Sequence, residues 1–103
     1  MTYDELITSQ PLVLVEFFAT WCGHCKAMEP VVQQVTEILE GKCKVQQLDV
    51  DLNQEVCDKE KISGTPTFIL YKDGREVWRQ SGEMPGSELL EAVEKNFWFK
   101  FHY

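Results

Sequence analysis

Stretches of apolar residues at two different spacings divide the chain into helices and strands. Thr2 and Glu5 have the spacing of a capping box, which predicts a short helix at the start of the chain. The nearly continuous apolar run 12–18 predicts a strand covered on both of its faces. Apolar residues then recur at helical spacing over residues 28–39, and this segment ends at Gly41, which predicts a long helix.

The next segments predict an edge strand and a short helix. Residues 44–50 have the composition of a strand, but Gln46 and Gln47 interrupt its apolar pattern. Polar residues inside a strand fit the edge of a sheet better than its centre. Residues 54–59 predict a short helix after this strand.

The last third of the chain predicts a hairpin and a closing helix. Two β-prone runs, 67–71 and 77–80, flank an Asp-Gly pair, which is a strong signal for a hairpin. Pro85 suits the first turn of a helix whose apolar positions run from 89 to 97. The whole order predicts an α/β fold with a central mixed sheet flanked by helices, in a single domain over residues 1–103.

Composition and charge exclude several classes of protein. A chain of 103 residues with 44% hydrophobic residues can build a core without cross-links, so its four cysteines are not required as a disulfide framework. The formal net charge of −7 argues against nucleic acid or anionic lipid as a partner, because both bind clusters of Lys and Arg.

The start of the chain has no pattern of a targeting segment. Residues 1–5 are acidic where a secretory signal is basic, and no apolar stretch with a cleavage site follows them. The longest apolar run, 11–19, contains Glu16 and is too short to span a bilayer. We therefore expect a cytoplasmic protein that is not associated with a membrane.

The pair Cys22 and Cys25 carries the strongest chemical signal, because it lies between a buried strand and a helix. The partial positive charge of a helix N-terminus favours a thiolate, which is the nucleophilic form of cysteine. The first cysteine is nearer the helix end, so we expect Cys22 to attack and Cys25 to resolve. The alternative is half of a zinc site, but Cys43 and Cys57 do not form a second close pair. We expect no metal.

Two segments resemble the thioredoxin superfamily. Residues 17–26, Phe-Phe-Ala-Thr-Trp-Cys-Gly-His-Cys-Lys, are similar to its active-site segment, and residues 64–67, Gly-Thr-Pro-Thr, are similar to its cis-proline loop. The resemblance extends over residues 11–97 and implies the thioredoxin fold. It also implies a cis peptide bond before Pro66, which would face Cys22. An ordinary turn proline is the alternative.

The resemblance further implies how a substrate binds. The backbone beside the cis-proline would pair with an extended substrate chain, on a shallow apolar docking surface. The residues implied in this surface are Trp21, Gly23, Val50, Thr65 and Gly82.

Glu16 is a candidate proton acceptor. The family has a buried Asp or Glu beneath its resolving cysteine, and Glu16 lies between the apolar residues Val15 and Phe17. Burial raises the pKa of a carboxyl group, so Glu16 could deprotonate Cys25 near neutral pH. The alternative is a glutamate that points outward from the strand.

Three positions depart from the family pattern. Gln47 stands where many relatives have a lysine that pairs with the buried carboxylate, and no counterpart of the usual first strand precedes Leu12. His24 replaces the proline of reducing thioredoxins, so the motif is the Cys-Gly-His-Cys form typical of protein disulfide isomerases. A histidine here can stabilise the Cys22 thiolate and make the couple more oxidising, unless it is merely exposed.

These features predict a thiol–disulfide oxidoreductase that reduces protein disulfides. It would be a monomer with no cofactor beyond its dithiol, recycled by a thioredoxin reductase or an equivalent protein. The first alternative is a disulfide isomerase or oxidase of the same fold. The second is a non-catalytic binding subunit, against which the intact dithiol argues.

Two further features have open interpretations. Cys43 and Cys57 could form a regulatory disulfide or could simply be small buried side chains. The aromatic tail 97–103 could fold back over exposed core, pair with a second chain, or extend the last helix.

Overall fold

The apolar run at the start of the chain forms the strand at the centre of the molecule. The computed structural model describes residues 1–102, with side chains as far as Phe97. The elements are α1 (Tyr3–Thr8), β1 (Leu12–Phe18), α2 (Gly23–Ile38), β2 (Lys44–Asp49), the 3-10 turn η1 (Val50–Leu52), α3 (Gln54–Lys59), β3 (Thr67–Lys72), β4 (Arg75–Ser81) and α4 (Gly86–His102). Their order along the chain is the predicted one.

The four strands form one mixed sheet in the order β2-β1-β3-β4. β1 runs parallel to β2 and antiparallel to β3, and β3 pairs with β4 in an antiparallel hairpin. Because β1 and β3 have neighbours on both sides, their residues are almost all buried, which confirms the prediction from the apolar run 12–18.

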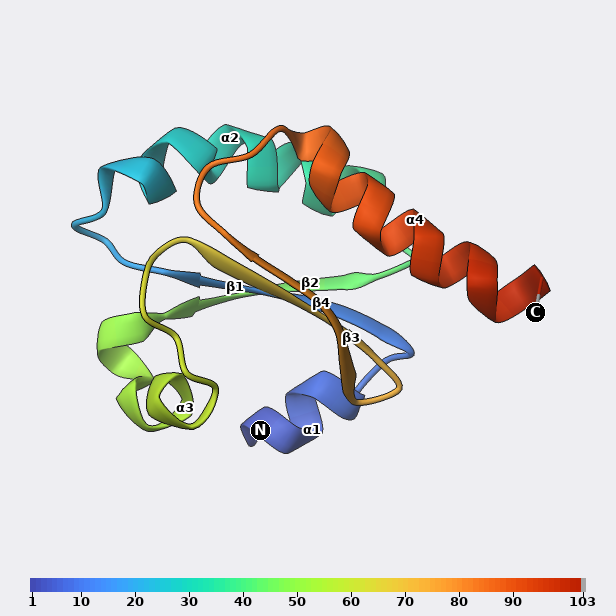
Figure 1. Ribbon diagram of the computed structural model, residues 1–103, viewed down its shortest axis with the longest axis horizontal. Helices are drawn as coiled ribbons and strands as arrows, with labels where there is room; N and C mark the ends of the chain where they lie inside the picture. The colour runs from blue at the N-terminus through green and yellow to red at the C-terminus, as the bar shows by residue number, and fades with distance from the viewer. Residues whose placement is uncertain (103) are drawn as a thin grey trace.

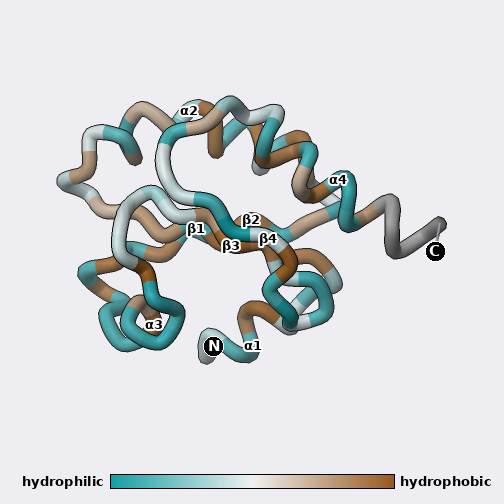
Figure 2. The backbone as a smooth tube through the Cα atoms, viewed as in Figure 1, coloured by the Kyte–Doolittle hydropathy of each residue, from teal (hydrophilic) through white to brown (hydrophobic). Residues whose placement is uncertain are grey.

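Helices cover both faces of this sheet, as Figure 1 shows, with α2 and α4 on one side and α1 and α3 on the other. Alternate residues of β1 enter the two cores: Leu12 and Leu14 pack with α2 and α4, whereas Val13 and Val15 pack on the opposite face. Figure 2 shows hydrophobic positions along the central strands and hydrophilic positions on the outer turns. The α/β prediction is therefore confirmed.

β2 is an edge strand, as its two glutamines predict. Within residues 1–102 no strand pairs with its outer side, which agrees with the expected absence of the family's first strand. The predicted strand, residues 44–50, is one residue longer than the observed β2, which ends at Asp49. Val50 belongs to η1 instead, because the Asp49 side chain accepts a hydrogen bond from the Asp51 N–H (2.8 Å) and caps the turn.

The hairpin is longer than the sequence pattern predicts. Its strands pair as far as Lys72 and Arg75, so the connection is only Asp73-Gly74. Both turn residues have positive φ, 50° and 82°, which is the geometry of the tight turn that Asp-Gly favours. Such a turn matches the twist of the strands, and pairing therefore extends into the charged residues on either side.

Both ends of the chain are helical. The capping box at Thr2 and Glu5 is present, with both reciprocal hydrogen bonds formed (2.8 and 3.1 Å). α4 continues through His102, which agrees with the helix extension among the alternatives for the tail. The tail's side chains from Trp98 onward, and Tyr103 entirely, lie outside the described residues, so the proposed aromatic contacts stay a prediction.

Candidate active site

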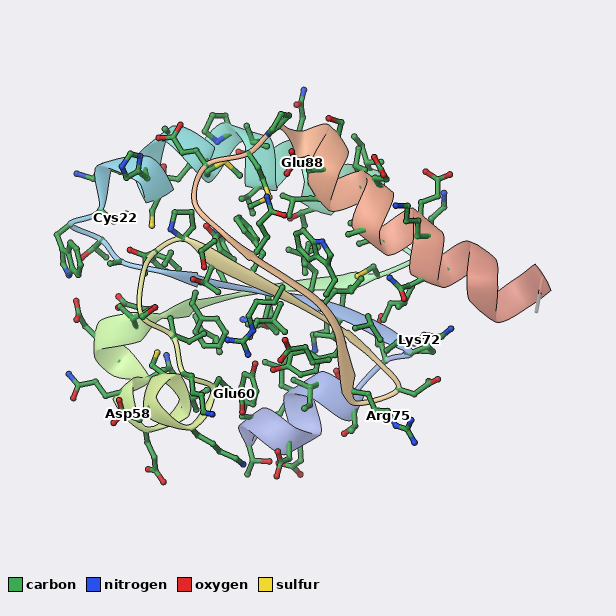
Figure 3. All side chains as sticks on the ribbon, in the orientation of Figure 1. Cys22, Asp58, Glu60, Lys72, Arg75 and Glu88 are labelled. Atoms are coloured by element: carbon green, nitrogen blue, oxygen red, sulfur yellow. The ribbon has the colours of Figure 1, made fainter. Side chains whose placement is uncertain are left out.

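Cys22 lies where β1 gives way to α2, at one end of the sheet (Figure 3). It is the N-cap residue of α2, and its sulfur accepts a hydrogen bond from the backbone N–H of Cys25 at 3.3 Å. A side chain in this position faces the free N–H groups and the positive end of the helix dipole. The structure thus confirms the predicted placement of the first cysteine at a helix N-terminus.

The surroundings of Cys22 favour its thiolate. An interaction with the Cys25 side chain, followed by one with the Thr65 side chain, lowers the pKa of Cys22 to about 7. Backbone N–H groups of Cys25 and His24 act in the same direction. At neutral pH a large fraction of Cys22 is therefore ionised, and a thiolate is the form that attacks a disulfide.

Cys25 lies in the first turn of α2, and only 4% of its surface is exposed. Burial, and then the hydrogen bond with Cys22, raises the pKa of the Cys25 thiol. The pKa values of the two thiols therefore shift in opposite directions, although both side chains are buried: Cys22, which is 7% exposed, caps the helix, and Cys25 lies one turn further along it. The roles of Cys22 as the attacking and Cys25 as the resolving cysteine stay a prediction.

Glu16 is buried in β1, with 1% of its surface exposed. It points to the α2 side of the sheet, since it shares that face with Leu12 and Leu14. Burial is the largest cause that raises the pKa of this carboxyl group, and the charge of Glu29 adds to it. The outward-pointing alternative is excluded by this burial.

Gln47 is the direct partner of Glu16. Its Nε2 donates a hydrogen bond to Glu16 Oε1 at 2.8 Å, and this bond lowers the pKa of Glu16 against the effect of burial. The residue that departs from the family pattern therefore still binds the carboxylate. An amide carries no charge, so it stabilises the ionised carboxylate less than an ammonium group does, and burial remains the larger effect.

A groove of about 700 Å³ connects Glu16 and Cys25 with the surface. It lies between α2 and the edge strand β2, and its wall includes Glu29, Gln33 and Gln47. Both buried groups line the same space, so a proton on either can be exchanged through it. The sequence did not predict this groove, because it depends on how α2 crosses the end of the sheet.

A second, shallower pocket of about 490 Å³ lies on the other side of Cys22. The peptide bond between Thr65 and Pro66 is cis, and the Thr65 carbonyl accepts a hydrogen bond from the Cys22 sulfur at 3.5 Å. This contact brings the loop before β3 next to the Cys22 sulfur. The lining residues are Trp21, Cys22, Gly23, His24, Val50, Cys57, Ile62, Ser63, Gly64 and Thr65.

Four of the five residues implied in substrate docking line this pocket, and Gly82 does not. Gly82 instead fixes the neighbouring loop, because its N–H donates a hydrogen bond to the Pro66 carbonyl at 2.8 Å. Trp21 is 69% exposed, and its indole N–H donates to the Asp51 carboxylate at 2.9 Å. An exposed aromatic ring held in place in this way offers a rigid apolar surface beside the thiol.

His24 contacts a residue that the sequence did not identify. Its Nδ1 lies 2.6 Å from Oε1 of Glu83, in the loop between β4 and α4. This hydrogen bond is the largest cause that raises the pKa of His24, and the negative charge of Glu83 and the Cys22 charge act in the same direction.

The two remaining cysteines lie in different cores. Cys43 packs on the α2 and α4 face of the sheet and Cys57 on the α1 and α3 face, and all four cysteines are free thiols. The sheet between them excludes a disulfide between Cys43 and Cys57. Both behave as small buried side chains, and burial raises the pKa of each.

Within the described part of the chain, no three His, Cys, Asp or Glu side chains gather in a way that could hold a metal ion. None of the helices in residues 1–102 combines the length and the apolar character needed to cross a bilayer.

The family profile described as Thioredoxin matches residues 1–95. The chain belongs to the thioredoxin family. Among curated proteins, a thioredoxin of Staphylococcus saprophyticus is 40% identical over 94 residues, which cover 91% of this chain and 89% of the relative. The chloroplastic thioredoxin Y of Oryza sativa is 37% identical over 94 residues, or 90% of this chain.

This thioredoxin-family chain spans about half the length of the plant relatives that it matches, 56% for the Oryza sativa protein and 53% for the chloroplastic thioredoxin Y1 of Arabidopsis thaliana. Solved structures agree with the family. A thioredoxin from Plasmodium falciparum has a TM-score of 0.82 and 38% identity, and covers 90% of this chain and 89% of its own. A mutant thioredoxin from Halobacterium salinarum has a TM-score of 0.82 and 33% identity, with 89% and 80% covered.

Proposed function

We propose that this chain is a thiol–disulfide oxidoreductase that reduces protein disulfides through Cys22 and Cys25. One observation carries the proposal: a thiol with a pKa near 7 caps a helix, next to a buried partner thiol and beneath an open pocket. Cys43, which is buried in the core and caps no helix, has its pKa raised instead. Family membership over residues 1–95 supports the same chemistry.

In the first step, the Cys22 thiolate attacks one sulfur of a substrate disulfide. A mixed disulfide forms, and the other substrate sulfur leaves as a thiolate that takes up a proton. The pocket beside Thr65 suits an extended substrate segment, because the backbone of this loop lies next to the Cys22 sulfur. The apolar ring of Trp21 would cover the segment from one side.

In the second step, Cys25 resolves the mixed disulfide. Its thiol has a raised pKa and must lose a proton first, and the buried carboxylate of Glu16, which lines the same groove, is the candidate acceptor. The Cys25 thiolate then attacks the Cys22 sulfur, the second substrate thiolate leaves, and the Cys22–Cys25 disulfide forms. Two electrons have then passed to the substrate, so an external two-electron donor must restore the dithiol.

We further propose the substrates, the electron donor and the compartment for this reaction. Substrates are protein disulfides, and a thioredoxin reductase or an equivalent protein supplies the electrons; one similar structure concerns a yeast peroxiredoxin and the glutathione and thioredoxin systems. The chain would act as a single-domain monomer without a cofactor, in a reducing compartment such as the cytoplasm. Nucleic acid and membranes would not be partners, in keeping with the net charge of −7.

His24 favours a second candidate function, disulfide isomerisation or oxidation. A positively charged side chain near Cys22 stabilises the reduced form and makes the couple more oxidising. The relatives that this chain matches over most of their own length are nevertheless named as thioredoxins, which favours reduction. We therefore keep reduction as the primary assignment.

A redox titration against glutathione tests the direction of the reaction. We expect the Cys22–Cys25 couple to have a midpoint between about −270 and −220 mV, on the reducing side of the thiol–disulfide scale. A midpoint near the value of about −180 mV of protein disulfide isomerase would assign the protein to isomerisation or oxidation instead.

The matched variant His24→Pro should be still more reducing, by tens of millivolts (on the order of 10 to 40 mV). Proline removes the imidazole, and it also lacks the backbone N–H that His24 directs toward the Cys22 sulfur. Equal midpoints would show that His24 has no part in setting the potential, and a shift to a less negative value would show that His24 acts in the direction opposite to the one proposed.

A further inference from the structure

Glu83 is held rigidly at the edge of the redox site. The residues on either side of it are anchored: Gly82 donates its N–H to the Pro66 carbonyl at 2.8 Å, and Met84 donates its N–H to the Met28 sulfur at 3.5 Å. These bonds tie the loop between β4 and α4 to the cis-proline loop and to α2. The carboxylate of Glu83 is thereby placed beside the first turn of α2.

The contact with His24 uses one specific ring nitrogen. Glu83 Oε1 lies 2.6 Å from Nδ1, so the carboxylate accepts a hydrogen bond from Nδ1–H. A carboxylate at one imidazole nitrogen fixes the tautomer and the ring orientation, and it stabilises the protonated ring. The hydrogen bond from Nδ1 therefore sets both the tautomer of the His24 imidazole and the orientation of its ring.

His24 is linked to Cys22 in two ways: its backbone N–H lowers the pKa of Cys22, and the charge of Cys22 raises the pKa of the His24 ring. Glu83 and Cys22 are the two titratable groups that act on His24 among the described residues, and the His24 N–H contributes to the low pKa of Cys22. A protonated ring next to the N-cap sulfur favours the thiolate. His24 and Glu83 are 74% and 49% exposed, so solvent screens the interaction and the effect is moderate.

We propose that Glu83 is a positioning residue of the redox site, which binds Nδ1 of His24 and orients its imidazole at the pocket that Cys22 also lines, and so favours the Cys22 thiolate. Glu83 lies far from Cys22 in the sequence and is joined to it only by the fold. The inference deepens the proposed function and rests on it, since it concerns the nucleophile of the same reaction. It predicts that the effect of Glu83 on Cys22 passes through His24.

Glu83 could act on Cys22 by two routes, and these have opposite effects on the stability of the Cys22 thiolate. Acting through His24, the carboxylate favours the thiolate, because it keeps the imidazole positive. Acting directly, its own negative charge disfavours a second negative charge on Cys22. A substitution that removes only the charge therefore separates the routes by the sign of its effect.

The test is the rate at which Cys22 is alkylated, measured against pH in Glu83→Gln. We expect the midpoint to rise above that of wild type, so that the rate at pH 7 falls about threefold. In Glu83→Asp, which keeps the carboxylate, we expect most of the wild-type rate. A proton NMR titration should show a lower pKa for the His24 ring in Glu83→Gln than in wild type.

A double-mutant cycle of His24 and Glu83 tests whether the effect of Glu83 on Cys22 passes through His24. When His24 is replaced by Asn, the further change Glu83→Gln should leave the alkylation rate unchanged or raise it slightly. If Glu83→Gln instead slows alkylation as much without His24 as with it, or speeds it in the wild-type background, the inference is wrong. Glu94→Gln, on the exposed side of α4, is the charge control and should behave as wild type.

The reduction of a protein disulfide is followed in the same preparations. If wild type fails to turn over, the proposed function is contradicted. If wild type turns over and the Glu83 cycle shows no coupling with His24, only the inference is overturned. Guanidine unfolding of each variant identifies any loss of structure, and a fully folded Glu83→Gln with an unchanged alkylation midpoint also overturns it.

Discussion

Replacement of Cys22 by serine is expected to abolish the reduction of protein disulfides. A serine hydroxyl is not ionised at neutral pH and cannot form a disulfide, so no covalent route remains and turnover should fall by at least about a thousandfold. The measurement is the steady-state reduction of a protein disulfide with an external reductant. Folding should be preserved, because the substitution changes one atom of an N-cap residue and serine is a good N-cap.

The matched control is Cys43→Ala, which removes a buried thiol in the core between the sheet and α2. We expect it to lose some stability, on the order of 1 kcal/mol, and to retain turnover. If Cys22→Ser kept more than a few per cent of the wild-type rate, a different group would be the nucleophile, and the assignment of Cys22 would be wrong.

Glu16→Gln should slow the resolving step by Cys25 and should also raise the free energy of unfolding. Without a carboxylate, Cys25 loses its proton acceptor, and the resolving step is expected to slow by roughly tenfold to a hundredfold while the attack of Cys22 is little changed. Single-turnover kinetics separate the two steps, because the mixed disulfide accumulates before it decays. A glutamine also has the size to stay in contact with Gln47.

The stability effect follows from the raised pKa of Glu16. Below the unfolded-state pKa of about 4.3 the carboxyl group is protonated in both states, and wild type and Glu16→Gln should be similar in stability. As the pH rises, the folded state holds its proton longer than the unfolded state does, so wild type loses stability until the pH exceeds the folded-state pKa. Urea unfolding at pH 4 to 8 measures this.

The variant should therefore be the more stable protein at pH 8, by on the order of 1 kcal/mol. If the two proteins showed parallel profiles of unfolding free energy against pH, Glu16 would have the same pKa in both states. The burial argument for its role as proton acceptor would then fail. A normal rate of resolution in the variant would also exclude that role.

The elements of the fold were predictable because each has a local cause. The capping box of Thr2 and Glu5 begins α1, the unbroken apolar run forms the central strand, and the Asp-Gly pair forms the hairpin turn. Where the prediction was wrong, a local hydrogen bond decided the outcome: the Asp49 side chain caps η1 and takes Val50 out of β2. Side-chain caps of this kind are not visible in a hydrophobic pattern.

The candidate site was predictable in its chemistry and less so in its surroundings. Cys22 and Cys25 stand out because their spacing and their place before a helix are encoded locally, and Glu16 because its neighbours in the strand are apolar. The Glu83 contact joins residues from α2 and from the loop before α4, and nothing in either segment points to the other. Gly82 does not line the pocket beside Cys22, and its N–H binds the Pro66 carbonyl, so its part in docking stays a prediction.

Mass spectrometry of a trapped intermediate tests the central claim most directly. In Cys25→Ser the resolving thiol is absent, so reaction with a protein disulfide should stop at a mixed disulfide. Peptide mapping under non-reducing conditions should find the substrate cysteine joined to Cys22. If no adduct formed, or if the substrate were joined to Cys43 or Cys57, Cys22 would not be the attacking group, and the mechanism built on it would be contradicted.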